Sequence, residues 1–416
     1  MAAAWELPGS PVARRAAIYG TAGRVFARYG RLKLPLSPGV EAAHAAGARD
    51  IYRTAVRLRG GFLKFGQFVS ARPDLLPADY VEELSKLQDR VPAAPAAVMT
   101  DVVEHDVGPV ADLFASFDDA ASAASLAQVH RAVRRDGRAV AVKIQYPNVA
   151  EIVPREAGDT RRILGLAGRA IRGLDLKTIG RILEQIILSE LDYAHEAENI
   201  ERFADNFASE PTIDAPRVHR DLSHGRVLVM DWIEGENLAR ALAVADRPLA
   251  EEAARILVDS YLKQLLIDGF LHADPHPGNF LLQPGPRLGV VDFGACAELS
   301  EPTRLAMRSL YAAGVRNDLH GAVEALDALG FKTRSGSLDA LVQWASLFAF
   351  EDTGENMEAA WGKLMAAHRA DPLVRIPEEL IMVGRVLIVQ TGLIARIRPS
   401  WRMEDLVEAR LGSPTP

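Results

Sequence analysis

The chain has 416 residues, of which 49% are hydrophobic and 25% are charged, and its net charge at pH 7 is −7. This length is enough to bury more than one hydrophobic core, so we expect two lobes and an additional N-terminal segment. The negative charge argues against general binding to nucleic acid, and the single cysteine, Cys296, excludes a framework of disulfide bonds and fits a reducing compartment.

The first forty residues are basic, with no acidic residue between Glu6 and Glu41. A basic amphipathic helix is typical of peripheral contact with anionic lipid, where each basic residue contributes about 1 kcal/mol. A transit peptide has the same composition, and so does an exposed helix with no affinity for membranes. We therefore predict a cytoplasmic protein that contacts a membrane surface, or a protein of an organelle matrix if the segment is a transit peptide. The basic residues are Arg14, Arg15, Arg24, Arg28, Arg31 and Lys33.

The segment from residue 41 to residue 115 contains Gly60-Gly-Phe-Leu-Lys-Phe-Gly-Gln67, in which Lys64 and Gln67 form a Lys-x-Gly-Gln motif. We expect this segment to be a helical extension. The proline-rich run Val91–Pro95 indicates the linker that leaves it.

Small residues dominate the segment from Ala120 to His130, and no glycine occurs between Gly108 and Gly137. Small side chains let a backbone approach phosphate groups, although alanine lacks the freedom of glycine at positive φ. We therefore predict that this alanine-rich loop covers the phosphates of a nucleotide in place of a glycine-rich loop. The residues expected to contact the nucleotide are Ser122, Ala123, Ala124 and Ser125.

A strand is predicted over residues 138–146, with Val140, Val142 and Ile144 on one face and Lys143 on the other. The turn Asp136-Gly137 pairs this strand with residues 126–134 in a hairpin. A lysine in this position neutralises the α- and β-phosphates of a nucleotide and is held by a carboxylate from a helix. The alternative is a surface lysine on an amphipathic strand.

The apolar periodicity of residues 180–207 predicts one helix, and a further helix is expected over residues 160–172. Asp192 and Glu196 fall on one face of the first helix, and Glu190 lies about a third of a turn away. We predict that Glu196 pairs with Lys143, and that Glu190 and Asp192 serve Lys64 and the nucleotide. The alternative is an acidic stripe exposed to solvent.

The sequence His219-Arg-Asp221 matches the opening of a kinase catalytic loop, but its position argues against that role. Arg226 stands five residues after Asp221, where a metal ligand is needed, and an apolar strand follows directly. We interpret the match as a coincidence in a loop. The strand, over residues 226–233, suits the hinge between two lobes, where backbone groups from Met230 to Ile233 would meet an adenine.

The most informative motif is His272-Ala-Asp-Pro-His-Pro-Gly-Asn279, which is followed by Asp292-Phe-Gly294. Asp274 precedes Asn279 by five residues, which is the spacing of a protein-kinase catalytic loop. In that chemistry the first Asp meets the substrate hydroxyl, and the Asn and the second Asp hold Mg²⁺ against the phosphates. We therefore predict Asp274 as the catalytic residue beside Lys143, with Asn279 and Asp292 as metal ligands.

A zinc site formed by His272, Asp274 and His276 is an alternative, because alternate residues of a strand can ligate zinc. Pro275 and Pro277 break a regular strand, so we expect the histidines to shape the loop through hydrogen bonds instead.

Together these motifs resemble the ABC1/ADCK/UbiB (AarF) family of atypical protein-kinase-like proteins, from about residue 60 to the end of the C-lobe. The alanine-rich loop, the Lys-x-Gly-Gln motif and the Glu-x-Asp motif at Glu190 carry the resemblance, and Ser122 departs from it where alanine is more usual. It implies an α+β, two-lobed protein-kinase-like fold with a helical N-terminal extension and a mostly helical C-lobe. It also implies binding of ATP or ADP with Mg²⁺, and a role in quinone-lipid biosynthesis (ubiquinone or menaquinone) or lipid homeostasis. Lys64 and Gln67 would then lie over the active site and exclude protein substrates.

We divide the chain into a basic segment (1–40), the extension (41–115), an N-lobe (116–234), a C-lobe (235–410) and a tail (411–416). The apolar run from Leu380 to Ile397 is interrupted by Arg385 and Gln390, so we interpret it as a C-lobe helix and not as a membrane span. The helices expected in the C-lobe are Arg304–Ala313, Leu319–Ala328, Leu338–Phe350, Asn356–Ala367 and Glu378–Ala395.

Three functions remain open. The first is an atypical kinase or ATPase of the ABC1 type, with a lipid or quinone precursor as a partner. The second is a small-molecule phosphotransferase, since the His-x-Asp-x-His-Pro-Gly-Asn sequence is also similar to aminoglycoside and choline kinases, which lack the Lys-x-Gly-Gln motif. The third is a nucleotide-binding pseudokinase scaffold, against which the presence of Lys143, Asp274, Asn279 and Asp292 argues. The sequence leaves the phosphoacceptor open.

Overall fold

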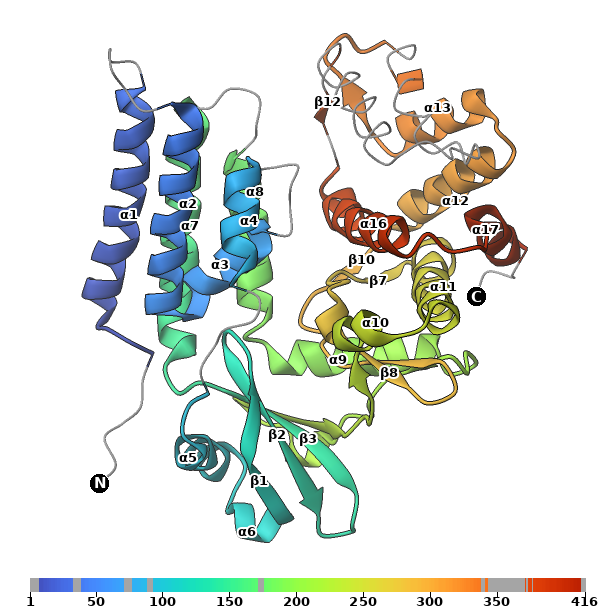
Figure 1. The fold of residues 1–416 in the computed structure, drawn as a ribbon. Helices are drawn as coiled ribbons and strands as arrows, with labels where there is room; N and C mark the ends of the chain where they lie inside the picture. The colour runs from blue at the N-terminus through green and yellow to red at the C-terminus, as the bar shows by residue number, and fades with distance from the viewer. Residues whose placement is uncertain are drawn as a thin grey trace. The chain divides into compact units, whose positions relative to one another are not determined.

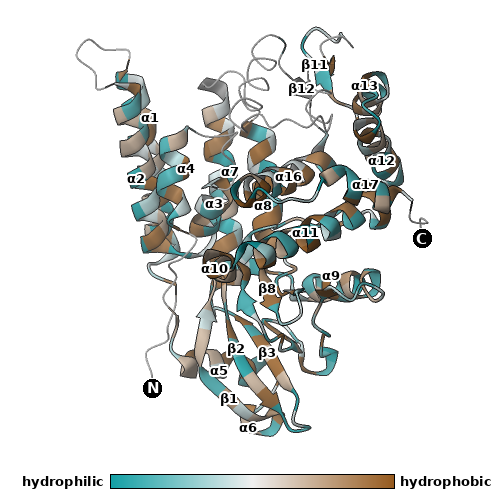
Figure 2. Cartoon of the chain, turned by 45° about the vertical axis from the view of Figure 1, so that its right-hand side comes forward, coloured by the Kyte–Doolittle hydropathy of each residue, from teal (hydrophilic) through white to brown (hydrophobic). Residues whose placement is uncertain are grey.

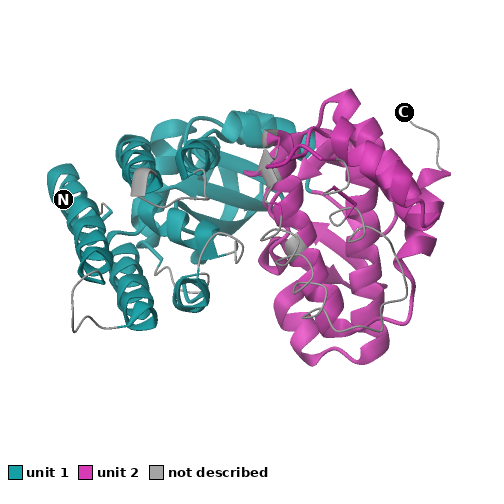
Figure 3. Cartoon of the chain, turned by 90° about the horizontal axis from the view of Figure 1, so that it is seen from above, with its two compact units in different colours: residues 1–201, 216–232 teal, residues 202–215, 233–416 magenta. Residues whose placement is uncertain are grey.

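The computed structural model describes residues 7–32, 39–70, 77–87, 93–170, 176–337, 341–342, 371, 373–375 and 377–412. The chain forms two compact units, shown in teal and magenta in Figure 3. Unit 1 comprises Met1–Glu201 and Pro216–Trp232, and unit 2 comprises Arg202–Ala215 and Ile233–Pro416.

A bundle of helices forms one part of unit 1, with four helices that precede the sheet in the chain and two that follow β3 (Figure 1). Its helices bury a core that includes Ala55, Leu63 and Leu84. These helices are α1 (Pro11–Arg31), α2 (Val40–Leu58), α3 (Gly60–Ser70), α4 (Ala78–Ser85), α7 (Val149–Ala170) and α8 (Leu176–Ser189).

A four-stranded antiparallel sheet follows in the order β1-β2-β3-β5. Val140, Val142 and Ile144 are fully buried on one face of β3, so the predicted strand and its hairpin are confirmed. Figure 2 shows apolar residues along β3. The helix α5 (Ala96–Asp106) packs on the buried face through Met99 and Val103. The strands are β1 (Phe114–Ala123), β2 (Ala127–Arg134), β3 (Ala139–Gln145) and β5 (Val227–Asp231), and the short helix α6 (Val110–Leu113) precedes β1.

Two helix predictions for unit 1 need correction. The continuous helix over residues 180–207 is wrong, because α8 ends at Ser189 and α9 (Tyr193–Asn206) begins after a break. Asp192 causes the second helix to start anew, since its carboxylate accepts a hydrogen bond from the backbone N–H of His195 at 3.0 Å, as an N-cap does. The helix expected from residue 160 begins eleven residues earlier, at Val149, and continues through Pro154 because Ile152, Val153 and Ala157 bury its apolar face.

Unit 2 is mostly helical. Its small sheets are β4-β9-β8-β6, β7 with β10, and β11 with β12. The helices are α10 (Leu238–Val244), α11 (Arg247–Lys263), α12 (Glu301–Val315), α13 (Leu319–Ala328), α16 (Glu378–Ile397) and α17 (Met403–Leu411). The strands are β4 (Ile213–Asp214), β6 (Glu236–Asn237), β7 (Phe270–His272), β8 (Phe280–Gln283), β9 (Arg287–Val290), β10 (Cys296–Glu298), β11 (Lys332–Thr333) and β12 (Leu373–Arg375).

The C-lobe helices predicted near residues 304, 319 and 378 are present as α12, α13 and α16. Most of the helix expected over residues 338–350, and all of that over 356–367, lies outside the described residues. The helix α17, which ends at Leu411, was not predicted. Among the described helices, none is long and apolar enough to cross a membrane.

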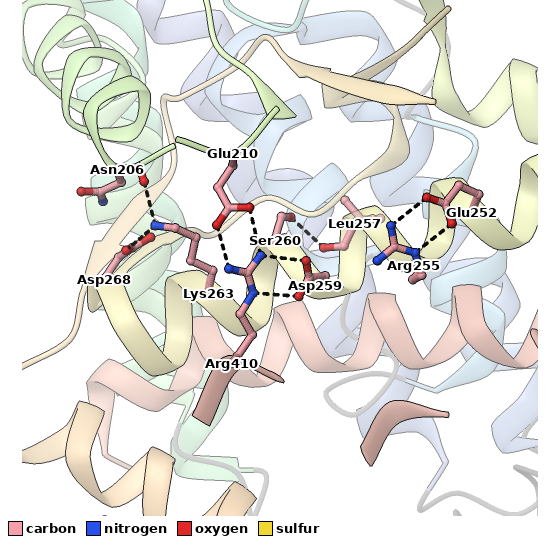
Figure 4. A network of polar contacts seen from close by, with 10 residues as sticks. All are labelled: Asn206, Glu210, Glu252, Arg255, Leu257, Asp259, Ser260, Lys263, Asp268 and Arg410. Carbon is pink, nitrogen blue, oxygen red and sulfur yellow. Dashed lines mark hydrogen bonds and ion pairs between the residues drawn. The ribbon is translucent and has the colours of Figure 1, made fainter. Parts of the chain in front are cut away.

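Arg410 explains why α17 is ordered although its own sequence is weakly amphipathic. Its guanidinium donates to both Asp259 on α11 and Glu210, with the shortest contacts at 2.7 Å (Figure 4). Nearby, Lys263 binds Asp268 and the backbone oxygen of Asn206. The contacts of Arg410 therefore hold α17, the last of the described helices, to α11.

A buried ion pair anchors the helical extension of unit 1. Arg14 on α1 is 1% exposed and lies 2.6 Å from Glu156 on α7. Arg14 also donates to the backbone oxygen of Leu58 at the end of α2, and Glu156 accepts from the backbone N–H of Phe62 at the start of α3. Burial raises the pKa of Glu156, against the opposing effect of Arg14. The pair therefore fixes the junction from which the Lys-x-Gly-Gln helix starts.

We predict that Arg14→Met lowers the free energy of unfolding by about 3–5 kcal/mol, because it leaves the carboxylate of Glu156 buried without its counter-ion. The double variant with Glu156→Gln should regain most of this loss. Arg15→Met is the matched control, since Arg15 is exposed and its partner Asp159 also accepts hydrogen bonds from Tyr19 and Arg162. Urea unfolding curves measure all three, and equal losses for Arg14→Met and Arg15→Met would contradict the assignment.

Candidate active site

The predicted site residues are divided between the two units. Unit 1 carries the alanine-rich loop, Lys143, the Glu-x-Asp motif with Glu196, and the Lys-x-Gly-Gln motif. Unit 2 carries Asp274, Asn279 and Asp292. The chain passes between the units at three places, and one of them, between Trp232 and Ile233, lies within the segment predicted as a hinge.

Lys143 forms an ion pair with Glu196 in unit 1. The Nζ atom lies 2.5 Å from Oε1, and the two side chains are 12% and 1% exposed. The alternation of β3 directs Lys143 away from the buried face, and α9 supplies the carboxylate. A carboxylate this deeply buried needs a cation beside it, so the pair is a structural requirement of unit 1. This contact is the one that the sequence predicted, while the binding of phosphate by Lys143 stays a prediction.

The Lys-x-Gly-Gln motif of the extension contacts the Glu-x-Asp motif, which lies at the break between α8 and α9. Lys64 on α3 lies 2.6 Å from Glu190, and both side chains are about four-fifths buried. Gln67 donates to the backbone oxygen of Leu87 at 2.9 Å, which ties α3 to the end of α4. The structure therefore brings Lys64 to Glu190, and it connects Gln67 to the extension itself.

Asp192 occupies a different position from its neighbour Glu190. It caps α9, and it lines a cavity of about 450 Å³ together with Tyr193, Arg220 and His224. Asp192 lies directly before the first residue of α9, one turn before Glu196, whose backbone N–H donates to the backbone oxygen of Asp192 at 2.9 Å. A contact between Asp192 and a nucleotide stays a prediction.

The alanine-rich loop is a tight turn between β1 and β2. The backbone N–H of Ala124 donates to the oxygen of Ala127 at 2.8 Å, and Ser122 pairs with Val129 in the sheet. Ala123 and Ala124 are not among the described residues with positive φ, so the turn does not need the conformational freedom of glycine. Ser122 is exposed and Ser125 is buried, so the hydroxyl of Ser122 is the more accessible of the two predicted donors.

The predicted hinge begins inside the sheet of unit 1. Met230 pairs with Ala141 of β3 and with Val218, and Trp232 donates to the backbone oxygen of Ala139. Ile233 belongs to unit 2, where its side chain fills the space beside Gly289 that a Cβ atom there would occupy. Contacts of Met230 and Ile233 with an adenine stay predictions.

In unit 2 the catalytic-loop motif and the Asp-Phe-Gly motif are joined by hydrogen bonds. The side-chain amide of Asn279 donates to the backbone oxygen of Asp274, and the N–H of Val291 donates to the backbone oxygen of Asn279, both at 3.1 Å. Asp292 accepts from the backbone N–H of Gly294 at 3.1 Å. The strands β7 and β10, which flank the two motifs, pair with each other.

His272 lies at the centre of this arrangement and is 1% exposed. Its Nε2 lies 2.5 Å from the backbone oxygen of Asp292, and its Nδ1 lies 3.2 Å from the hydroxyl of Tyr261. Phe280 and Phe293 contact the imidazole ring edge-on, with ring centroids 5.7 and 5.5 Å from its own. Burial lowers the pKa of His272, so the neutral ring donates from Nε2 and accepts at Nδ1.

The histidines of the motif shape the loop, as the sequence favoured over a zinc site. Both ring nitrogens of His272 are engaged in the hydrogen bonds above, and Nδ1 of His276 accepts from the backbone N–H of Gly278 at 3.0 Å. Cys296 lies in β10, half-buried, with its sulfur near the backbone oxygen of Phe293.

Arg385 is a site residue that the sequence did not identify as one. Its guanidinium on α16 lies 2.5 Å from the Oδ1 atom of Asp274, and the two side chains are 9% and 20% exposed. The pair joins residues 111 positions apart. The sequence contains one indication of this pair, which is a charged residue inside an apolar run. A charge on the buried side of a helix needs a partner of opposite charge.

The donor atoms fit a magnesium ion. The amide nitrogen of Asn279 is engaged with Asp274, which leaves the amide oxygen as the atom suited to a hard cation, and Asp292 supplies a carboxylate. Among the described residues no group of three or more His, Cys, Asp and Glu is arranged to hold a metal. Two oxygen ligands completed by phosphate and water are the arrangement that Mg²⁺ favours, so the residues fit this ion.

The fold and the site residues define a protein-kinase-like protein with α+β architecture. The ABC1 atypical kinase-like domain matches residues 86–326, more than half of the chain, and the chain belongs to this family.

Curated relatives agree with this family. The chain is 32% identical over 375 residues to the chloroplastic protein Activity of BC1 Complex Kinase 1 of Arabidopsis thaliana, covering 86% of this chain and 54% of that protein. It is 31% identical over 369 residues to a chloroplastic aarF domain-containing protein kinase of the same plant, covering 86% and 52%. The chain therefore spans about half the length of these relatives.

A solved structure, that of Rv3197 from Mycobacterium tuberculosis in complex with erythromycin, is similar over 90% of this chain and 98% of that chain. The TM-score is 0.62 and the sequence identity is 25%.

An ordinary histidine side chain has a pKa of 6.5 and becomes charged below that pH. Because the pKa of His272 is lowered, we predict that His272 stays neutral in the folded protein at pH values somewhat below 6.5. Since the folded state binds the proton less well than the unfolded state, the stability contributed by neutral His272 is present above pH 6.5 and is lost as the pH falls through the lowered pKa. NMR titration of ¹³C-labelled histidine, assigned with a His272→Asn variant and compared with the protein in urea, measures this. A His272 signal that titrates at or above pH 6.5 in the folded protein would contradict the buried, hydrogen-bonded ring.

Proposed function

We propose that this chain binds ATP or ADP with Mg²⁺ and acts as an atypical kinase or ATPase of the ABC1 type. The observation that carries the proposal is the ion pair between Lys143 and Glu196, because it is the lysine–carboxylate pair that kinases use to hold a nucleotide. The hydrogen-bonded grouping of Asp274, Asn279 and Asp292 supports it from unit 2.

Each residue has a role in this proposal. Lys143 binds the α- and β-phosphates, and the alanine-rich loop covers them. Asn279 and Asp292 hold Mg²⁺, which neutralises the charge of the phosphates when it is bound. Asp274 orients the attacking hydroxyl or water and takes its proton as the γ-phosphoryl group leaves the bridging oxygen of the nucleotide. Arg385 fixes the carboxylate of Asp274.

We further propose that the acceptor is a lipid or a quinone precursor, and that the chain supports isoprenoid-quinone biosynthesis or lipid homeostasis. The contact of Lys64 with Glu190 supports a restricted active site, since it holds the Lys-x-Gly-Gln helix to the break that precedes α9. The proposed membrane contact through α1 has less basic charge available than its sequence suggests. Four of its arginines pair with carboxylates, and they are Arg14, Arg15, Arg24 and Arg28.

A nucleotide-binding pseudokinase is the second candidate. The ion pair with Arg385 favours it, because Asp274 has to release or share this partner in order to accept a proton. A small-molecule phosphotransferase of the aminoglycoside or choline kinase type is disfavoured, because such enzymes lack the Lys-x-Gly-Gln motif that ends in Gln67.

Three aspartate variants separate these functions. Asp274→Asn should keep Mg²⁺-dependent binding of ADP and lose about 10²–10⁴-fold in ATP turnover, since it removes the proton acceptor. Asp292→Asn should lose the Mg²⁺ dependence of binding as well. Asp221→Asn is the matched control, because Asp221 lies in the similar His-Arg-Asp sequence of unit 1 and should change neither property. Calorimetry measures binding, and phosphate release measures turnover.

Magnesium-dependent turnover that survives Asp292→Asn would contradict the metal assignment. Nucleotide binding without measurable turnover in the unaltered protein would favour the pseudokinase. An effect of Asp221→Asn as large as that of Asp274→Asn would show that the wrong motif was assigned.

A further inference from the structure

Two polar side chains, Gln128 and His130 of β2, are enclosed in the apolar core of unit 1. Both are 0% exposed. In the sheet they pair with Ile144 and Val142 of β3, so they lie on the face that packs against α5 and not on the face of Lys143. Polar groups buried in this way are hydrogen-bonded, and their partners show which segments they hold.

Gln128 holds the segment that leaves the extension. Its Oε1 atom accepts a hydrogen bond from the backbone N–H of Ala94, and its Nε2 atom donates to the backbone oxygen of the same residue at 3.3 Å. The side-chain amide therefore binds Ala94 as the backbone of an antiparallel strand would. Ala94 is buried and belongs to the proline-rich run that the sequence indicates as the linker of the extension.

His130 holds an irregular part of β1. In the ladder, the pair of Phe117 with Ala132 is followed by the pair of Ala121 with His130. Four steps along β1 therefore match two steps along β2, and the additional residues form a β-bulge. The Nδ1 atom of His130 lies 2.8 Å from the backbone oxygen of Asp118 in this bulge. The ring of Phe117 stacks on the imidazole, with the centroids 4.8 Å apart.

These contacts form one buried network that runs from Ala94 through Gln128 and His130 to Asp118. The amide nitrogen of Gln128 lies 3.2 Å from Nε2 of His130. A backbone oxygen can only accept, so Nδ1 of His130 carries a proton. The N–H of Ala94 can only donate, so it faces the oxygen of Gln128 and leaves the amide nitrogen to donate to Nε2.

The network requires a neutral imidazole ring, because a proton on Nε2 would face the amide N–H. Burial lowers the pKa of His130, against the opposing effects of the backbone of Asp118 and of the carboxylates of Asp119 and Asp118. The neutral ring with its proton on Nδ1 is the reverse of the arrangement at His272, where Nε2 donates.

The network ends at the alanine-rich loop. The residues opposite Gln128 and His130 on β1 are Ala123 and Ala121. Ala124 then closes the turn with a backbone hydrogen bond. A bulge sets the stagger of the residues that follow it along a strand, and here those residues are the loop.

We propose that Gln128 and His130 are positioning residues, which join the linker of the extension to the alanine-rich loop and hold the loop in the conformation that covers the phosphates of a nucleotide. They lie on the opposite face of the sheet from Lys143, so they act through the loop. A change in the linker reaches the loop through the same hydrogen bonds, because Ala94 is the first member of the network. The effect on the nucleotide rests on the proposed function, whereas the effect on the conformation of the loop does not.

The first test uses the full chain without nucleotide and observes ¹³C-labelled alanine methyl groups by NMR. Gln128→Met keeps the length of the side chain and removes both hydrogen-bonding groups, so the methyl signals of Ala121 and Ala124 should shift. Val140→Ala is the matched control. Val140 is fully buried in the same core and takes no part in the network, so this variant leaves a cavity and the two signals should stay in place.

The second measurement is the long-range ¹H–¹⁵N spectrum of the histidine rings, with the His130 signals assigned by a His130→Asn variant. In the unaltered chain His130 should be neutral and protonated on Nδ1. In Gln128→Met the Nε2 atom loses its donor, so the proton should distribute between the two nitrogens. A side chain that only fills space at position 128 would leave this spectrum unchanged.

Calorimetry with ADP and Mg²⁺ measures the consequence for the nucleotide. His130→Phe removes both ring nitrogens and should weaken the binding of ADP about tenfold, the effect of losing about one hydrogen bond. His130→Asn keeps an N–H group near the position of Nδ1 and should bind ADP almost as well as the unaltered chain. Val140→Ala should bind ADP as the unaltered chain does.

Unchanged signals of Ala121 and Ala124 in Gln128→Met, or an equal change in Val140→Ala, would overturn the positioning role. A proton on Nε2 of His130 in the unaltered chain would overturn the order of the hydrogen bonds. Equal affinity of His130→Phe and the unaltered chain for ADP would overturn the link to the nucleotide. An unaltered chain that binds no ADP would overturn the proposed function, while the methyl and nitrogen spectra decide the positioning of the loop independently.

Discussion

The requirement that a buried charge has a partner governs the structure of unit 1. Glu196 is almost completely enclosed, and without Lys143 its carboxylate would be a large cost. The pair therefore holds α9 to β3, and it also leaves an ammonium group on the side of the strand opposite to the apolar core. The same requirement acts at Arg14 and Glu156, which fix the start of the helix that carries Lys64. Lys143 and Glu196 are therefore both a buried ion pair that the fold requires and candidate residues for nucleotide binding.

In unit 2 the central buried group is a neutral histidine and not an ion pair. His272 is buried among aromatic rings and both of its ring nitrogens form hydrogen bonds, so it connects the catalytic-loop motif to the backbone of Asp292 without introducing charge. Asp274 and Asp292 are the carboxylates nearby, and Arg385 pairs with Asp274. The hydrogen bonds of His272 and the ion pair of Asp274 thus connect the segments that carry the predicted metal ligands and the predicted proton acceptor within this unit.

The sequence predicted the elements whose signals are local. Alternation along β3 placed Lys143 correctly, and the turn at Gly137 set the hairpin. The break before α9 was missed, because apolar periodicity continues across it and the capping role of Asp192 competes with that signal. Arg385 and Arg14 were missed as site and anchor residues, since their partners lie more than one hundred positions away. The motifs identified the family, whereas the acceptor depends on a pocket shape that no motif encodes.

In the proposed function, Lys143 and Asp292 bind the same nucleotide. Replacing Mg²⁺ by paramagnetic Mn²⁺ in the presence of ADP tests it directly, with methyl-labelled Val142 and Val290 as reporters beside the two residues. We predict that Mn²⁺ with ADP broadens the methyl signals of Val142 and Val290, and that Asp292→Asn abolishes the broadening of both signals. Broadening of the Val290 signal alone, with Val142 unaffected, would contradict it.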